Sequence, residues 1–262
     1  MAISDNPSQM GSLAMSLVVS PLVVAAMILR FIATRKAARR VGAEDWSAFL
    51  ATVSCLGFNV LSIWCICLFD GRDFTQIPLD TLTSILKAGY IMTQFFPLNQ
   101  FFAKVSILLL YHRIFSVNKF YARWIWGIGI AQTLWTLAAM LTLFFQCQPV
   151  HFYWDKLVPG GKCIDEVALL VGFEIPNSSI DFAMVALALV MLRDLKMRQA
   201  TRWKVAGFFA AGGFAGIIGF LKIAAHFTAG QMSNTVLSLW GNAQMLLSIL
   251  CCCVPIYNSL FS

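Results

Sequence analysis

Two acidic residues lie within an otherwise apolar stretch of the chain. Glu174, Ser178 and Asp181 are spaced four and three residues apart, which places them on one face of an α-helix. At about 1.5 Å per residue, Glu174 would lie roughly 10 Å from Asp181 along the helix axis. A buried carboxyl group beside a cation or a base can carry out general acid–base catalysis, so both acids are candidate catalytic groups.

Lys104 is the expected ion-pair partner of Asp181. Counting residues along the two apolar stretches puts both side chains near the middle of a bilayer, where an isolated charge is costly. Two interpretations stay open for this pair. It is either a buried salt bridge that fixes two helices or part of a catalytic site.

A second group of ionisable residues is expected in the outer half of the bundle, namely Lys87, Glu174, Lys222 and His226. Several such groups in one low-dielectric cavity mark a candidate functional pocket. The alternative is a polar network, with the two lysines extending toward the membrane interface. Residues predicted to line the pocket and bind substrate are Lys87, Tyr90, Gln94, Trp64, Asn177, Trp240, Asn242 and Gln244.

Two prolines favour a pocket over closed helix packing. Pro97 and Pro176 lie inside apolar stretches, and each removes one helical hydrogen bond and frees the carbonyl four residues earlier. Within a membrane, such breaks are tolerated where other protein groups or water satisfy the backbone.

The composition predicts an all-α membrane protein with a single domain over residues 1–262. Of the 262 residues, 59% are hydrophobic and 12% are charged, against about 25% charged in a soluble domain. A membrane helix needs about 20 mostly apolar residues. Seven transmembrane helices are therefore predicted, at about 12–34, 46–69, 83–112, 122–147, 167–192, 204–228 and 233–259.

The distribution of charge predicts the orientation. Lys and Arg concentrate in the first, third and fifth connections, whereas the opposite connections carry Arg72, Lys156 and Lys162 among several acids. Basic loops stay in the cytosol, so the N-terminus should lie outside it and the C-terminus inside. The net charge of +7 is thus attributed to membrane orientation and not to nucleic-acid binding. The expected location is the endoplasmic reticulum or the plasma membrane.

The cysteines and glycines suggest covalent and packing features. Cys147 and Cys163 flank a Pro-Gly-Gly turn in a non-cytosolic connection, where a disulfide can form. No cysteine or histidine spacing indicates a metal site. Gly212 and Gly216 have the spacing that lets membrane helices approach closely, either inside the bundle or in a homodimer through the sixth helix.

Four segments resemble the fungal rhodopsin-domain integral membrane proteins. They are residues 30–46 with Glu44-Asp45-Trp46, residues 104–115 (KVSILLLYHRIF), residues 147–154 (CQPVHFYW) followed by 160–165 (GGKCID), and residues 176–182 (PNSSIDF). The resemblance implies a seven-helix, rhodopsin-like bundle, and some members of the family resemble surface receptors.

The functional interpretation is weighed among three classes. Residues 232–262 contain no lysine, which excludes a retinal Schiff base at the usual place on the seventh helix. We interpret the chain as a membrane-embedded enzyme that needs no cofactor and acts on a lipophilic small molecule. Acid-catalysed cyclisation or isomerisation in a fungal terpenoid or polyketide pathway is the expected chemistry. The alternative is a receptor for an extracellular small molecule, and a transporter is the third class.

Overall fold

The protein folds into seven long α-helices and one short hairpin, seen in a computed structural model that describes residues 6–72, 76–116, 118–194, 199–228 and 234–257. The helices are α1 (Pro7–Lys36), α2 (Ala43–Phe69), α3 (Leu79–Phe115), α4 (Lys119–Phe144), α5 (Glu166–Asp194), α6 (Gln199–Thr228) and α7 (Asn234–Tyr257). Between α4 and α5 lie β1 (Cys147–Gln148), the 3₁₀-helix η3 (Val150–Tyr153) and β2 (Lys162–Cys163). The all-α class is confirmed, and each predicted stretch contains a helix.

The first six helices each begin before the predicted span, although α4 ends at Phe144, three residues before its predicted end. Helix α1 begins at Pro7, α2 at Ala43 and α6 at Gln199, several residues before the apolar stretches begin. Local capping explains the first start, since Asn6 accepts a hydrogen bond from the Gln9 amide and Pro7 occupies the first turn. The helices therefore extend past the apolar stretches on which the span prediction was based.

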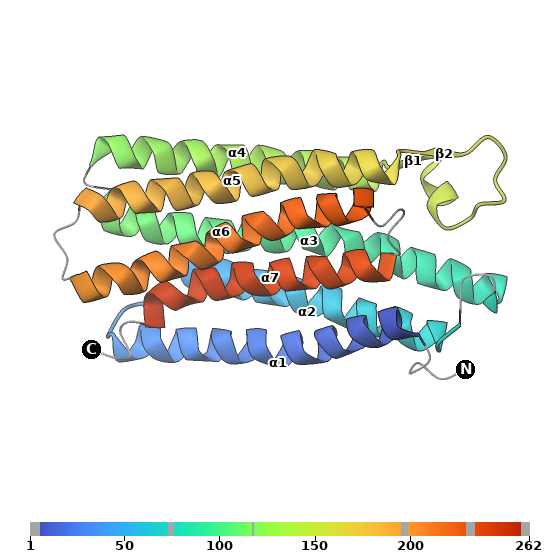
Figure 1. Ribbon diagram of the computed structural model, residues 1–262, viewed down its shortest axis with the longest axis horizontal. Helices are drawn as coiled ribbons and strands as arrows, with labels where there is room; N and C mark the ends of the chain where they lie inside the picture. The colour runs from blue at the N-terminus through green and yellow to red at the C-terminus, as the bar shows by residue number, and fades with distance from the viewer. Residues whose placement is uncertain (1–5, 73–75, 117, 195–198, 229–233, 258–262) are drawn as a thin grey trace.

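Neighbouring helices pack side by side around the bundle, and α7 contacts α1, α2, α3 and α6. Figure 1 shows the helices running along the long axis, with the start of α1 and the end of α7 at opposite ends of the bundle. The β1–β2 hairpin lies at the end that carries the N-terminus. This arrangement brings α3, α5, α6 and α7 together around the candidate catalytic residues.

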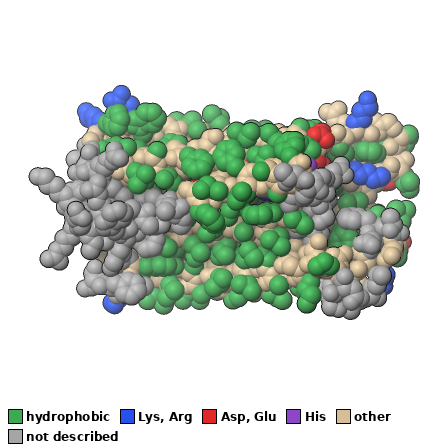
Figure 2. All heavy atoms as spheres, in the orientation of Figure 1, with side chains coloured by type: hydrophobic (Ala, Val, Ile, Leu, Met, Phe, Trp, Pro, Cys, Tyr) green, Lys and Arg blue, Asp and Glu red, His purple; other side chains and the backbone are tan. Residues whose placement is uncertain are grey.

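The surface is that of a helical membrane protein. Helices α1, α2, α4, α5 and α7 are long and apolar enough to cross a membrane, and α6 contains the shorter apolar stretch Gly212–Phe227. On the face shown in Figure 2, hydrophobic side chains cover the middle of the molecule, and the coloured charged side chains gather toward its two ends. The protein is thus of the multi-pass membrane type.

Candidate functional site

Helix α5 takes part in two buried ion pairs, and the one farther from the hairpin, which we call the inner pair, joins α3 to α5. Lys104 Nζ lies 3.0 Å from Asp181 Oδ1, and both side chains are at least nine-tenths buried. The same ammonium group donates to Asn177 Oδ1 at 2.7 Å and to the Asn177 carbonyl at 3.0 Å. Lys104 therefore has three oxygen acceptors from one face of α5, as a charge buried this deeply requires.

The outer pair joins α6 to α5. Lys222 Nζ lies 2.6 Å from Glu174 Oε1, and Gln244 of α7 donates to Glu174 Oε2 at 3.3 Å. A Cβ atom at Gly219 would collide with Ser178 Oγ and would lie 3.0 Å from Glu174 Oε2. Glycine at this position allows α6 to approach the acidic face of α5 closely enough for the pair to form.

The two pairs belong to one polar cluster, which we define as Lys104, Glu174, Asn177, Ser178, Asp181, Lys222, His226 and Gln244. Within the described part of the chain, several of its buried polar atoms have no hydrogen-bond partner, namely Asn177 Nδ2, Ser178 Oγ, Asp181 Oδ2, His226 Nδ1 and Gln244 Oε1. Buried polar groups are usually paired. This concentration of unpaired donors and acceptors is what a binding or proton-transfer site requires.

A cavity of about 40 Å³ lies against the inner pair. Lys104, Asp181, Ser248 and Cys251 line it together with mostly apolar residues of α3, α5, α6 and α7. Asp181 thus lines the cavity, and its Oδ2 atom has no hydrogen-bond partner among the residues that the structure describes. The outer pair and His226, which were predicted to form the pocket, do not line this cavity.

The backbone near Pro176 is satisfied by a neighbouring helix. Helix α5 continues through this proline, and the indole of Trp135 on α4 donates to the Phe173 carbonyl at 3.2 Å. The carbonyl that Pro176 frees is that of Gly172, four residues earlier, so this bond serves the next carbonyl along the helix. It holds the turn that presents Asn177 and Ser178 to the bundle interior.

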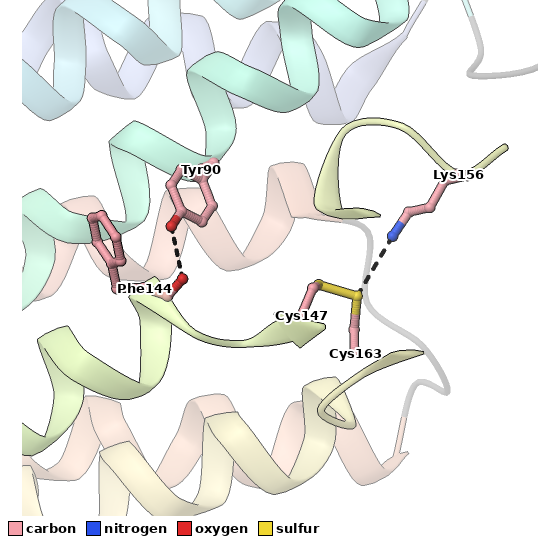
Figure 3. The surroundings of a disulfide bond; sticks show 5 residues. All are labelled: Tyr90, Phe144, Cys147, Lys156 and Cys163. Carbon is pink, nitrogen blue, oxygen red and sulfur yellow. Dashed lines mark hydrogen bonds between the residues drawn. A yellow bond between two sulfur atoms is a disulfide. The ribbon is translucent and has the colours of Figure 1, made fainter. Parts of the chain in front are cut away.

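Four of the predicted substrate-binding residues lie away from the cluster. Lys87 lies over the Trp154 ring, 6.0 Å from its centroid, at the outer end of α3. The Tyr90 hydroxyl donates to the Phe144 carbonyl at 2.8 Å, as Figure 3 shows. Trp64 is 48% exposed on α2. Asn242 turns toward α1 and α2 and donates to Asn59 Oδ1 at 2.6 Å.

Of the other four residues predicted to bind substrate, two belong to the cluster and two are half-buried elsewhere on α3 and α7. Asn177 and Gln244 join the cluster through the contacts described above. Gln94 of α3 has a half-buried side chain whose amide oxygen and nitrogen are both buried without a hydrogen bond. Trp240 is half-buried on α7.

The predicted disulfide is confirmed and closes the hairpin. Cys147 and Cys163 are bonded and face each other in the antiparallel β1–β2 pair, and Lys156 lies next to Cys163 (Figure 3). Lys156 Nζ also lies 4.7 Å from the centroid of the Phe152 ring. Burial, together with the nearby charge of Glu166, raises the pKa of the Tyr153 phenol in η3.

The glycine-rich face of α6 is in contact with α5. A Cβ atom at Gly212 would lie 3.5 Å from Val185, and one at Gly216 would lie 3.3 Å from the Phe182 ring. These glycines therefore serve packing within the bundle, and dimerisation through α6 stays a prediction. Among the residues that the structure describes, no three His, Cys, Asp or Glu side chains come together as metal ligands.

Comparison with known proteins identifies the family. The family model described as the fungal rhodopsin domain matches residues 29–262. The chain belongs to the fungal rhodopsin-domain family. The resemblance found in the sequence is thus confirmed. No solved structure matches the chain.

Curated relatives of this fungal rhodopsin-domain protein carry two kinds of name. Wortmanamides biosynthesis cluster protein C of Talaromyces wortmannii is 36% identical over 98% of this chain and 72% of its own length. Satratoxin biosynthesis SC1 cluster protein 4 of Stachybotrys chartarum is 40% identical over 64% of this chain and 63% of its own length. A third, Receptor GIN3 of Arthrobotrys oligospora, is 21% identical over 88% of this chain and 57% of its own length.

A further charged network in this fungal rhodopsin-domain protein was not assigned a role from the sequence. Asp45 of α2 is fully buried and accepts from Arg30 at 3.0 Å and from Arg39 at 2.9 Å. Glu44 lies 2.7 Å from Arg113 of α3. Arg30 also donates to the carbonyls of Glu44 and Cys252, which ties α1 to α2 and α7.

The sequence did contain a signal for this network. Arg30 falls inside the first predicted span, 12–34, where an arginine must find a partner. It was counted instead among the basic residues that set the orientation. The acidic pair Glu44-Asp45, noted above as part of the family resemblance, supplies the partner.

Proposed function

We propose that this protein is a membrane-embedded enzyme of a fungal secondary-metabolite pathway, acting on a lipophilic small molecule by acid–base catalysis. Two of its relatives are named as biosynthesis cluster proteins. The main observation behind the proposal is the position of Asp181. Its buried carboxylate is paired with Lys104 through Oδ1, its Oδ2 atom is unpaired, and the residue lines a cavity. Cyclisation or isomerisation is the proposed reaction.

The chemistry follows from the arrangement of the inner pair. Once a proton has reached Asp181 through the cluster, the resulting carboxylic acid would give it to an olefin or epoxide, and Lys104 would stabilise the carboxylate that forms again. Loss of a proton from another carbon of the product cation returns Asp181 to its starting state. The sequence of steps is redox-neutral and therefore needs no cofactor. The aromatic ring of Tyr111, which lines the cavity, supports the proposal because aromatic faces stabilise cations.

Glu174 and Lys222 form the second candidate acid–base pair. Glu174 lies on the same face of α5 as Asp181, and Lys222 belongs to α6. Asn177 and Ser178 lie between the two acids, and the unpaired Asn177 Nδ2 and Ser178 Oγ atoms could bind water or a substrate oxygen. In this proposal Asp181 contacts substrate, and Glu174 supplies or accepts protons through the cluster. His226, one helical turn from Lys222, is the outermost titratable member.

The proposed topology has all seven helices crossing the membrane, with the N-terminus outside the cytosol. The start of α1 and the end of α7 lie at opposite ends of the bundle (Figure 1), which supports an odd number of crossings. The disulfide-bonded hairpin lies at the N-terminal end, and disulfides persist in oxidising compartments. The endoplasmic reticulum and the plasma membrane both satisfy this orientation.

The test is conversion of a precursor by microsomes that contain this protein alone. The precursor is the lipophilic extract of a strain in which the gene has been deleted, and products are followed by mass spectrometry. Asp181→Asn and Glu174→Gln should each lower the rate about 10²-fold or more, whereas Asp80→Asn, an exposed acid at the start of α3, should not. Full activity in both cluster variants would overturn the proposal.

A receptor is the second candidate function, and two observations favour it. One relative is named as a receptor, and the exposed Arg113 bridges α3 to Glu44 of α2 at the inner end of the bundle. A receptor of this kind should bind ligand saturably and lose its downstream response in Arg113→Ala. An unchanged response in that variant would count against it.

A further inference from the structure

The cavity beside Asp181 is bounded on one side by the contact between α5 and α6. Asp181, Met184 and Val185 line it from α5, and Gly212 and Ala215 line it from α6. A Cβ atom at Gly212 would lie 3.5 Å from Val185 Cγ2 and 4.0 Å from Cys251 Sγ. Glycine at this position thus leaves open a space that a larger side chain would fill.

An aromatic pair covers the same contact on the outer surface of the bundle. Phe182, the residue after Asp181, stacks on Phe220 of α6 with ring centroids 6.1 Å apart and planes inclined by 22°. Both side chains are about 40% exposed. Phe182 also lies against Gly216, where a Cβ atom would be only 3.3 Å from the ring. Two partly exposed rings lie at the apolar surface over this part of the contact, and the Glu174–Lys222 ion pair joins the same two helices nearer the hairpin.

The cavity walls indicate what kind of molecule would bind. Most lining residues are apolar, including Ala103, Ile107 and Met184, and they surround a few polar groups at Asp181 and Ser248. The unpaired Asp181 Oδ2 can accept one hydrogen bond from a ligand donor. About 40 Å³ accommodates water but no drug-sized ligand, whose pockets span roughly 300–1,000 Å³. A larger ligand therefore fits only if the helices around the cavity move apart.

We propose that this cavity is the inner end of a binding site for a lipophilic alcohol that enters from the bilayer between α5 and α6. The hydrocarbon part packs against the apolar lining residues and extends toward Phe182 and Phe220. The hydroxyl group donates to Asp181 Oδ2. The inference rests on the proposed function, since it assigns to that enzyme the substrate class and the route by which substrate reaches the acid.

The test uses two photoreactive probes in proteoliposomes, a long-chain alcohol that carries a diazirine and the same chain without the hydroxyl group. Mass spectrometry maps the labelled peptides. The alcohol should label segments 103–111, 181–185 and 212–215 saturably and should be displaced by unlabelled hexadecanol. The hydrocarbon should label lipid-facing positions without saturation. Equal, non-saturable labelling by both probes would overturn the site.

A pair of adjacent glycines provides the matched variants. Gly212→Leu places its side chain in the cavity and should lower saturable labelling at least tenfold, and Gly212→Ala should give a smaller loss. Gly213→Leu should leave labelling unchanged, because a Cβ atom at Gly213 meets no atom within 4 Å. Equal labelling in Gly212→Leu and Gly213→Leu would overturn the assignment of the cavity.

Cross-linking tests the route between the helices. Oxidation of a Val185→Cys/Gly212→Cys variant should join α5 to α6 and abolish labelling until the bond is reduced. The control is Gly11→Cys/Leu239→Cys, which joins α1 to α7 where a Cβ atom at Gly11 would lie 3.4 Å from Leu239. Labelling that persists in the cross-linked α5–α6 variant would overturn the route. Saturable labelling without any conversion in the microsome assay would uphold the binding site and overturn the proposed function alone.

Discussion

Removing one charge of the outer ion pair, Lys222–Glu174, should destabilise the bundle far more than removing both charges together. In Lys222→Met, the Glu174 carboxylate stays buried and retains only the 3.3 Å hydrogen bond from Gln244. Removing one partner of a buried pair costs about 3–5 kcal/mol, because the other charge is left uncompensated. At roughly 2–4 °C per kcal/mol for a chain of this size, the melting temperature should fall by about 6–20 °C.

The double variant Glu174→Gln/Lys222→Met removes both charges and should cost less than the two single variants combined. A coupling free energy of about 2 kcal/mol or more is expected from groups in direct contact. Thermal unfolding of detergent-solubilised protein, followed with a thiol-reactive dye, measures all three variants. Arg72→Met is the control, because the Arg72–Asp70 pair is 3.8 Å long and about half exposed, and such pairs contribute roughly 0–1 kcal/mol. Additive losses in the cycle, or single losses as small as that of the control, would refute the argument.

Three further results are expected, each with its own measurement. Asp45→Asn leaves the fully buried Arg30 without its carboxylate partner, and it should lower the unfolding free energy by about 3–5 kcal/mol. The control is Arg113→Ala, at a half-exposed side chain, which should lower the unfolding free energy by at most about 1 kcal/mol in the same melting assay. Cys147→Ser opens a loop with a sequence separation of 16 and should cost roughly 3 kcal/mol; reductant should lower the melting temperature of the wild type but not of the variant. Because burial raises the pKa of Tyr153, its neutral phenol stabilises the fold below the unfolded-state pKa of about 10. That contribution is lost as the pH rises further, so Tyr153→Phe should flatten the decline of melting temperature above about pH 10, and an unaltered decline would contradict the role.

The helices were predictable from the sequence because apolar length is a local property. Each of the predicted stretches contains a helix, yet α1 begins at Pro7 and α6 at Gln199, beyond the apolar residues. A polar first turn can remain helical when it is capped, as it is by Asn6, so hydropathy alone does not locate the ends. The disulfide was also predictable, because two cysteines flank one turn.

Contacts between helices were harder to predict, because they depend on rotation and depth. Asn242 and Gln244 were both assigned to the pocket, but residues two apart on a helix point about 200° away from each other. Gln244 therefore reaches Glu174, and Asn242 faces Asn59. Lys87 was expected near Glu174, but it lies over Trp154, an aromatic residue whose position depends on the hairpin fold. The cavity depends on side-chain volumes from four helices, which no single segment reveals.

The distribution of polar contacts indicates where along their length α5 and α6 can separate. Arg30 links α1 to α2 and α7 at the inner end, and the Tyr257 hydroxyl donates to the Ala26 carbonyl at 2.6 Å, which adds a second link between α7 and α1. Arg113 adds α3 to this group through Glu44. At the cavity, by contrast, α6 meets α5 through Gly212 against Val185 and Gly216 against Phe182. Apolar contacts of this kind have no directional bonds to break, and in lipid their separation exposes only apolar surface to apolar solvent. The ion pair between the same two helices, Lys222–Glu174, lies nearer the hairpin, so the opening that the proposal requires is a local one beside Asp181 that leaves this pair intact.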